Sequence, residues 1–323
     1  MNLSRRSVMD VSLLVLVNAM WAAQYAAYKV ASQTMGPVTL SAWTFLFAGF
    51  ILLPFLLWER RRMGRGIAFQ GPAGIALPPG ARRLLSKRNL IGFLMIGVVG
   101  LIPASAFLAW GVSRSSASDA ALIYLTVPII TALLASLILN EKMTAVRWGS
   151  LFLALVGVLI LSDVDWRHVG LISSKFLTGN LLVLAACASS SFYNVYCKEL
   201  LSRFTPLEVL VVGYFLAVIL SVPLMVEIEG FSLHTVRSYP ATAWLALIVL
   251  SVLSWGLAMV LWMFLLKRLD VSQASVSIYL LPFLGVLISA ATLHERITVP
   301  MIIGGLVTLT GTILITTLEP SSA

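Results

Sequence analysis

The chain has 323 residues, of which 59% are hydrophobic and 11% are charged, and its mean hydropathy is +0.98. Soluble domains carry roughly 25% charged residues, so this composition excludes a water-soluble domain and predicts a membrane protein. The formal net charge is +9, but the basic residues stand in short loops between apolar runs, so we expect no nucleic-acid partner.

Ten apolar runs are long enough to cross a bilayer, which takes roughly 20 residues of helix. In chain order they are residues 11–31, 38–58, 90–112, 117–139, 146–162, 176–200, 207–226, 241–266, 271–293 and 299–317. Runs this continuous favour helices over a barrel, so we predict an all-α polytopic protein. Arg5 and Arg6 faintly resemble an export signal, but we interpret them as the basic start of the first span.

The distribution of Lys and Arg predicts the orientation of these spans. If the N-terminus is cytoplasmic, 16 of the 22 basic residues stand at cytoplasmic ends and five at outer ends. This positive-inside asymmetry predicts a multi-pass protein of a bacterial-type inner membrane, with both termini in the cytoplasm.

The second half of the sequence repeats the first. Four matched pairs stand 154 positions apart: Pro128 and Pro282, Glu141 and Glu295, Thr144 and Thr298, and Gly157 and Gly311. In the first two spans of each half the offset is 169, as for Pro37 and Pro206, because the loop between the second and third spans is longer in the first half. Five spans is an odd number, so we predict an inverted-topology repeat, with residues 1–163 as one copy and 164–323 as the other.

These features resemble the EamA-type transporters of the drug/metabolite transporter superfamily. The resemblance rests on the stretch from Trp21 to Lys29, on the two segments that run from a proline to Glu-x-x-Thr, and on the glycines after each segment. It covers residues 11–162 and 176–317, and one departure is Ile303 in the place of Gly149. The resemblance implies two five-helix halves around a central cavity and export of small metabolites by alternating access, with neither enzyme activity nor a cofactor.

Polar side chains on two matched spans are candidates for lining that cavity. On the first span Asn18, Trp21, Tyr25 and Lys29 share one face, since they are spaced by three and four residues. Their counterparts on the sixth span are Cys187, Ser190, Asn194 and Lys198. A polar stripe should face protein or water rather than lipid. The alternative is hydrogen bonding between helices, with the lysines reaching toward the membrane surface.

The eighth span places Ser251, Trp255, Met259 and Trp262 on one helical face. Tryptophan in the middle of a span is unusual because it prefers the membrane interface. These rings are candidates for an aromatic wall that accepts an apolar or cationic solute, and packing in the core is the alternative. Tyr124 and Tyr279 are further candidates for contact with substrate.

Two sets of matched residues are candidates for helix capping and for gating. Glu141 with Thr144, and Glu295 with Thr298, stand where the fifth and tenth spans begin, so capping of these helices is expected. Pro128 and Pro282 lie inside the fourth and ninth spans, where each frees a backbone carbonyl and acts either as a hinge or as a static kink.

The expected function is a secondary transporter that exports a small metabolite, such as an amino acid or a related amphipathic compound. Uptake, or flipping of a lipid-linked substrate, is the alternative within the same superfamily. A polytopic membrane enzyme would need clustered acids, bases or nucleophiles that the sequence does not offer. A proton or a counter-substrate as the driving partner is left open, because no acidic residue stands in the middle of a span, and no metal spacing is present.

Overall fold

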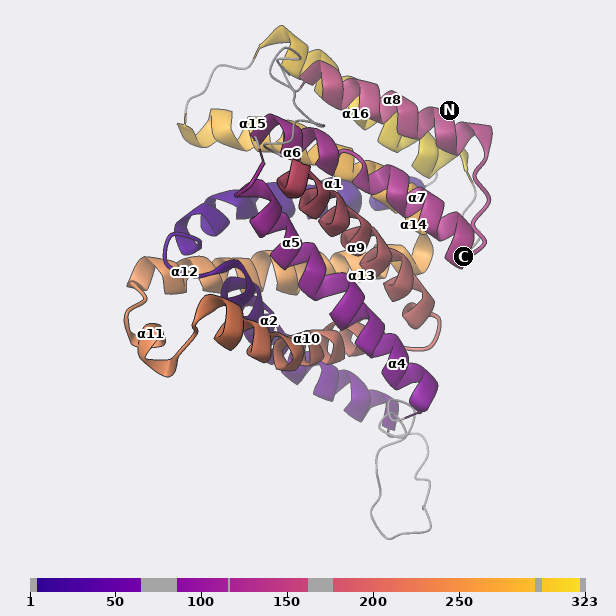
Figure 1. The fold of residues 1–323 in the computed structure, drawn as a ribbon. Helices are drawn as coiled ribbons and strands as arrows, with labels where there is room; N and C mark the ends of the chain where they lie inside the picture. The colour runs from indigo at the N-terminus through magenta and orange to yellow at the C-terminus, as the bar shows by residue number, and fades with distance from the viewer. Residues whose placement is uncertain (1–4, 65–85, 116, 162–176, 294–297, 320–323) are drawn as a thin grey trace.

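The structure is a computed structural model that describes residues 5–64, 86–115, 117–161, 177–293 and 298–319. All regular secondary structure in these ranges is helical (Figure 1). The first half contains α1 (Arg5–Ala31), α2 (Pro37–Gly64), α4 (Lys87–Met95), η1 (Ile96–Leu101), α5 (Ile102–Val112), α6 (Ala117–Tyr124), α7 (Val127–Ile138) and α8 (Ala145–Leu161). The second half contains α9 (Leu177–Leu201), α10 (Pro206–Glu229), α11 (Leu233–Arg237), α12 (Ala241–Val249), η2 (Leu250–Ala258), α13 (Met259–Arg268), α14 (Val271–Val276), η3 (Ser277–Tyr279), α15 (Leu280–Leu293) and α16 (Val299–Leu318).

Within the described ranges the predicted spans lie on helices, with interruptions inside the fourth and ninth, and the chain is an all-α polytopic membrane protein. Eight helical stretches within the described ranges are long and apolar enough to cross a membrane. The helix α8 is shorter, at 17 residues. The helix α9 is longer but carries buried polar side chains such as Ser191 and Asn194, and it is not among the eight. Ten membrane crossings therefore stay a prediction.

The third span of each half contains a π-helical segment that the sequence analysis did not foresee. The segment η1 begins at Ile96 and η2 begins at Leu250, which are matched positions 154 residues apart. A π-helix bonds each N–H to the carbonyl five residues earlier, so its turn is wider than that of an α-helix. Small residues stand at matched places in both segments, with Gly97 and Gly100 in one and Ser251 and Ser254 in the other.

The fourth and ninth spans are both interrupted just before their matched prolines. Residues 125–126 form a turn between α6 and α7, ahead of Pro128, and the 3-10 turn η3 lies between α14 and α15, ahead of Pro282. Proline has no N–H to donate and its ring displaces the carbonyl four residues earlier, so the α-helical ladder breaks there. The repeated prolines thus produce repeated breaks.

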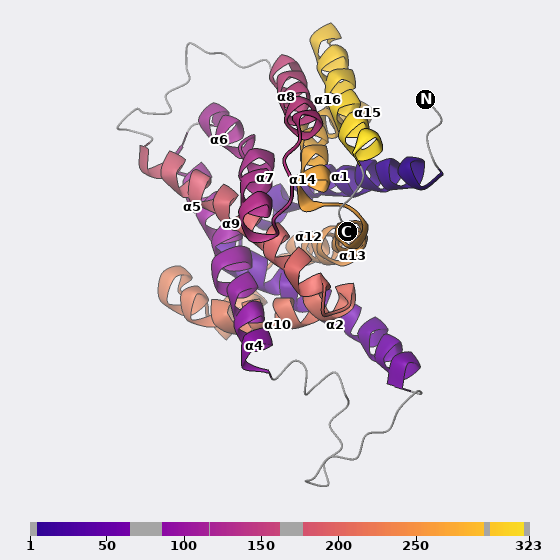
Figure 2. The same cartoon turned by 90° about the vertical axis from the view of Figure 1, so that its right-hand side faces the viewer.

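Matched helices of the two halves cross each other in antiparallel fashion. At one end of the α2–α10 pair, Arg60 meets Glu208 at 3.1 Å. At the other end the Glu229 carboxylate accepts the N–H groups of Val38 and Thr39. The helices α8 and α16 also lie side by side (Figures 1 and 2). Antiparallel crossing of matched helices is what an inverted repeat requires.

Among the described residues, three contacts join a residue to its own counterpart in the other half. The rings of Phe45 and Tyr214 stack with centroids 5.4 Å apart. The hydroxyl of Tyr279 donates to the carbonyl of Leu125 at 2.8 Å, and the hydroxyl of Thr308 donates to the carbonyl of Ala154 at 3.3 Å. Matched residues can touch only where they lie close to the axis that relates them. An approximate two-fold axis therefore runs through α2 and α10, the breaks in the fourth and ninth spans, and α8 and α16.

Glycines permit the close crossing of α8 and α16. A Cβ atom on Gly157 would stand 2.6 Å from the Thr308 backbone nitrogen and 2.7 Å from the Gly304 carbonyl oxygen. Small residues allow helix backbones in a membrane to approach this closely, which maximises their van der Waals contact. The matched Gly157 and Gly311 of the sequence repeat both lie in this crossing.

We predict that Gly157→Ala lowers the free energy of unfolding by about 1–3 kcal/mol, because the added methyl group overpacks the crossing. Gly149→Ala is the matched control in the same helix, since a Cβ there meets nothing within 4 Å. That change should be neutral or stabilising by up to about 1 kcal/mol. Thermal unfolding of the two purified variants in detergent measures the difference, and equal melting temperatures would contradict the crossing.

Candidate functional site

Several predicted substrate residues meet where α1, α9 and α13 pack together. Trp262 of α13 is fully buried, and its Nε1–H donates to Oδ1 of Asn194 on α9 at 3.0 Å. The ring of Trp262 lies 5.2 Å from that of Trp21 on α1, and Met259 is buried in the same cluster. The first, sixth and eighth spans thus supply one shared aromatic and polar centre.

Trp255 lies in a second aromatic group, which packs in the same buried cluster as the first. Its Nε1–H donates to the hydroxyl of Tyr28 at 2.9 Å, and its carbonyl accepts the Tyr214 hydroxyl at 2.8 Å. Its ring stands edge-on to Phe45, with centroids 4.8 Å apart. The sequence analysis missed Tyr28, Phe45 and Tyr214. The recurrence of an aromatic residue at the matched positions 45 and 214 was the signal that could have found the last two.

That Ser251, Trp255, Met259 and Trp262 share one face stays a prediction, and the helix that carries them is not α-helical throughout. Ser251 and Trp255 lie in the π-helical η2, whose wider turn changes the direction of the side chains. The Trp255 ring contacts Tyr28 of α1 and Phe45 of α2, and the Trp262 ring contacts Trp21 of α1 and Asn194 of α9, so both rings contact α1.

Side chains from neighbouring helices bond both broken spans, at backbone carbonyls in the first half and at a side-chain hydroxyl in the second. The Ser191 hydroxyl donates to the Val127 carbonyl at 3.1 Å, and the Cys187 thiol to the Ile123 carbonyl at 3.7 Å. In the other half the Asn18 amide donates to the Ser277 hydroxyl at 3.0 Å. Asn18 and Cys187 are counterparts in the repeat, so the same position of the polar stripe bonds the broken span in each half.

The remaining predicted substrate and gating residues are placed as follows. Tyr279 is buried and bonds across the axis to Leu125, while Ser190 and Tyr124 are half-buried. Pro128 is buried and Pro282 is half-buried. The side chain of Tyr25 and all of Glu295 lie outside the described residues.

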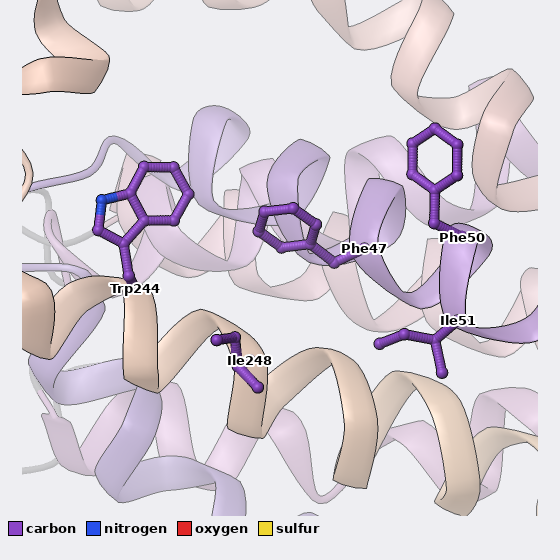
Figure 3. Close-up of a pocket in the computed structure, with 5 residues that line it drawn as sticks. All are labelled: Phe47, Phe50, Ile51, Trp244 and Ile248. Carbon is purple, nitrogen blue, oxygen red and sulfur yellow. The ribbon is translucent and has the colours of Figure 1, made fainter.

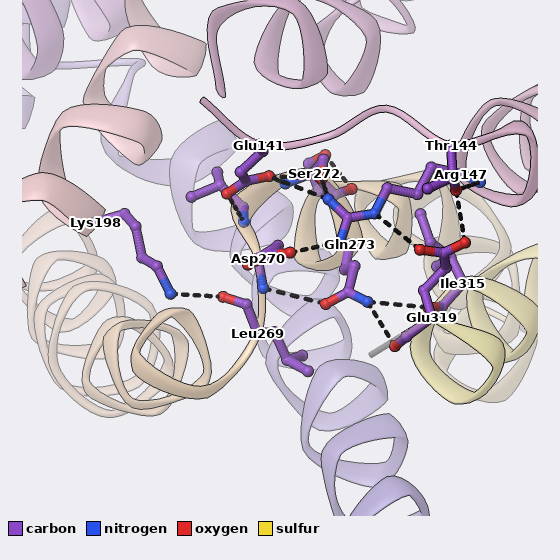
Figure 4. A network of polar contacts seen from close by, with 12 residues as sticks. Glu141, Thr144, Arg147, Lys198, Leu269, Asp270, Ser272, Gln273, Ile315 and Glu319 are labelled. Atoms are coloured by element: carbon purple, nitrogen blue, oxygen red, sulfur yellow. Dashed lines mark hydrogen bonds and ion pairs between the residues drawn. The ribbon is translucent and has the colours of Figure 1, made fainter. Parts of the chain in front are cut away.

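A buried charged network joins the two halves at the end of the bundle where α8 and α14 begin (Figure 4). The guanidinium of Arg147, only 3% exposed, lies 2.5 Å from Asp270, 3.5 Å from Glu319 and 3.8 Å from Glu141. It also donates to the Ser272 hydroxyl at 3.0 Å. One cation of the first half thus contacts three carboxylates, two of which belong to the second half.

Glu141 caps a different helix from the one predicted. Its carboxylate accepts the backbone N–H groups of Val271 at 2.7 Å and Ser272 at 3.0 Å, together with the Ser272 hydroxyl at 2.6 Å. It therefore stabilises the beginning of α14 in the other half. Asn140, with a positive φ of 57°, turns the chain between α7 and α8.

The two matched threonines behave differently. The Thr144 hydroxyl accepts the N–H of Arg147 at 3.2 Å where α8 begins, and it donates to Glu319 at 2.6 Å. Thr298 precedes α16 but makes no side-chain capping bond, so that expectation was wrong. Thr298 is exposed, whereas Thr144 is held against α16 by its bond to Glu319.

Two further polar residues fasten the same end of the bundle. Gln273 donates to the carbonyls of Ile315 and Glu319 at 3.3 and 3.0 Å, which ties α14 to the end of α16. Lys198 donates to the carbonyls of Leu266 and Leu269 at 2.6 and 3.0 Å, where α13 ends. A cation is favoured at that helix end because the last carbonyls carry partial negative charge. The sequence analysis had missed Arg147, Asp270, Gln273 and Glu319, whose only local signal is a polar residue at the end of a span.

An apolar groove of about 330 Å³ lies between α2 and α12 (Figure 3). It is lined by Phe47, Phe50, Ile51, Trp244 and Ile248. Phe50 and Ile248 are 56% and 51% exposed, so the groove opens to the outside of the bundle. None of the predicted substrate residues lines it, and the predicted central cavity stays a prediction. Within the described ranges no group of three or more His, Cys, Asp or Glu could hold a metal ion.

Known proteins resemble this chain over almost its whole length. It is 26% identical over 305 residues to a "probable terminal-alkyne amino-acid exporter" of Streptantibioticus cattleyicolor, which covers 94% of this chain and 91% of that protein. It is 25% identical to an uncharacterized transporter of Archaeoglobus fulgidus, with 94% and 96% covered. It is 22% identical to the uncharacterized transporter YoaV of Bacillus subtilis, with 91% of each chain covered.

The fold and the family agree with these relatives. A solved crystal structure superposes with a TM-score of 0.73 at 18% identity and covers 98% of both chains, so the fold is shared. Residues 9–163 and 177–317 match the EamA-like transporter family. The chain therefore belongs to the EamA-like transporter family, whose members are membrane transporters and not enzymes.

Proposed function

We propose that this transporter exports a small metabolite, an amino acid or a related amphipathic compound, from the cytoplasm across the inner membrane. The observation that carries the proposal is the approximate two-fold axis between halves that we assign to residues 1–163 and 164–323. Inverted repeats of this kind alternate between two conformations around a site at their interface. The name of the Streptantibioticus relative supports an amino acid as the substrate class.

The orientation we propose follows the distribution of basic residues. The end that carries Arg147, where α1 begins and α16 ends, is the cytoplasmic end, since most lysines and arginines flank it. Both termini then lie in the cytoplasm. The gradient that drives export is that of a proton or of a counter-substrate.

The site we propose for the substrate is the centre formed by Trp21, Asn194 and Trp262. Asn194 and the indole N–H of Trp262 bond each other here, and Trp262 is fully buried. A second conformation that separates α13 from α9 would free the Asn194 amide for a polar group and expose the indole faces. Such faces accept apolar groups, and they attract cations such as an ammonium group.

This site predicts that Trp21→Ala impairs export strongly, by about tenfold or more, because one aromatic wall is lost while the partly exposed position tolerates the change. Trp58→Ala is the matched control, since Trp58 is 58% exposed and stacks only with Arg62 of its own helix among the described contacts. The tenfold loss corresponds to about 1.4 kcal/mol of interaction with the substrate.

The measurement is efflux of a panel of amino acids and related amines from cells that overproduce each variant at equal membrane levels. Efflux of no compound above the empty-vector control would overturn the proposed function. Equal efflux by the two tryptophan variants would remove Trp21 from the substrate site and leave it a packing residue.

The broken spans are the hinges we propose for the conformational change. Pro128→Ala and Pro282→Ala restore a backbone hydrogen bond, stiffen α7 and α15 respectively, and should both slow efflux. Because the breaks lie in halves of opposite orientation, the two changes should bias accessibility toward opposite sides. Labelling of Asn194→Cys from each side, with Cys187 and Cys197 replaced, measures this bias. A shift in the same direction for both variants would leave the breaks as static kinks.

A further inference from the structure

The apolar groove between α2 and α12 lies at the depth of the lipid chains. Both helices belong to stretches that are long and apolar enough to cross a membrane. They begin close together, since the ring of Trp244, in the first turn of α12, packs on that of Trp43 with centroids 5.6 Å apart. Counted at 1.5 Å per residue, Trp244 lies about 5 Å from the beginning of its helix and Phe50 about 20 Å. One leaflet of hydrocarbon is about 15 Å deep, so the groove extends over about one leaflet.

The walls of the groove favour a hydrocarbon chain as the occupant. Its five lining side chains are hydrocarbon apart from the indole nitrogen of Trp244 (Figure 3). An empty groove would forfeit the dispersion contacts of these walls. Lipid chains are as apolar as leucine, so a chain from the surrounding bilayer fills the groove without a cost in dehydration.

The groove is too small to be an interface with a second copy of the chain. A stable interface buries about 800 Å² on each partner and takes about 20–30 residues a side, whereas five residues line this groove. Its volume of about 330 Å³ instead lies at the lower end of small-molecule sites, which enclose about 300–1,000 Å³. These dimensions match one slender ligand.

A cation stands at the mouth of the groove. Arg237 is the last residue of α11, shortly before α12 begins, and it is exposed. Val236 before it and Tyr239 after it pack in the same apolar cluster as Phe47 and Trp244, and the rings of Tyr239 and Trp244 lie 6.0 Å apart. None of the ion pairs in the described part of the chain includes Arg237. A cation above an apolar groove is complementary to a ligand with an anionic head and an apolar chain.

We propose that this groove is a phospholipid site, in which one acyl chain lies along the five lining residues and the phosphodiester of the headgroup pairs with Arg237. A guanidinium binds phosphate oxygens through two parallel N–H bonds, which makes the contact specific as well as strong. The helix α2 belongs to the first half and α12 to the second, so the lipid contacts both halves at once. It stabilises the conformation in which these helices form the groove, because a ligand shifts an equilibrium toward the state it binds better.

The test is native mass spectrometry of the purified full-length protein, delipidated in detergent and titrated with phosphatidylglycerol. Ile248→Trp fills the groove with a larger side chain, and Arg237→Gln removes the cation. We expect each change to weaken binding of the first phosphatidylglycerol by about tenfold, equivalent to about 1.4 kcal/mol. Diacylglycerol with the same chains lacks the phosphate, so it should bind the unmodified protein more weakly than phosphatidylglycerol and should be insensitive to Arg237→Gln.

Two matched controls separate the groove from the rest of the lipid-facing surface. Ile219→Trp makes the same enlargement on α10, where Ile219 is 65% exposed and does not line the groove. Arg61→Gln removes the same charge from the last turn of α2, at the opposite end of that helix, where Arg61 is also exposed. Both variants should bind the first phosphatidylglycerol as tightly as the unmodified protein.

Three results would overturn the site. Equal affinities of the groove variants and their controls would mean that lipid binds the surface without preference. Diacylglycerol that binds as tightly as phosphatidylglycerol would exclude the contact between Arg237 and phosphate. A dimer that Ile248→Trp dissociates and Ile219→Trp does not would make the groove a contact between two copies. Lipid binding is measured without transport, so the absence of any exported solute would contradict the proposed function while these affinities still decide the site.

Discussion

The constraint on which the structure depends is that, in lipid, every backbone polar group must find its partner inside the protein. The prolines in the fourth and ninth spans interrupt the ladder of α-helical hydrogen bonds. Neighbouring side chains therefore have to supply hydrogen-bond donors at the breaks. Ser191, Cys187 and Tyr279 donate to backbone carbonyls at the first break, and at the second Asn18 bonds the Ser277 hydroxyl, which itself donates to the Ala274 carbonyl. The breaks are thereby fastened to α1 and α9, the helices that also carry the aromatic and polar centre.

This arrangement couples the centre to the breaks through short physical links. Asn18 bonds Ser277 and lies one helical turn from Trp21, and Ser191 stands three residues before Asn194 on α9. A change in bend at either break would therefore move the helices that form the centre. The π-helical segments at matched positions in the third spans add a second pair of irregular sites, and such segments are frequent where function needs local adjustment.

The charged network around Arg147 lies at one end of the molecule, although matched helices of the two halves are arranged in a similar way. The axis passes through matched contacts such as Phe45 with Tyr214 and Ala154 with Thr308, so the two halves resemble each other in shape. In the repeat, Met301 stands at the position matched to Arg147, and Ser116 stands at the position matched to Asp270.

The sequence by itself determined the class, the helical spans, the repeat and the family, because hydrophobicity, chain length and internal repetition are properties of the chain alone. It also placed Trp21, Asn194 and Trp262 in one candidate site. Only the tertiary structure decided which helix Glu141 caps, that Arg147 contacts Asp270 and Glu319, and that Trp255 bonds Tyr28. Those outcomes depend on how the helices are rotated and crossed relative to one another, which the local pattern of residues does not determine.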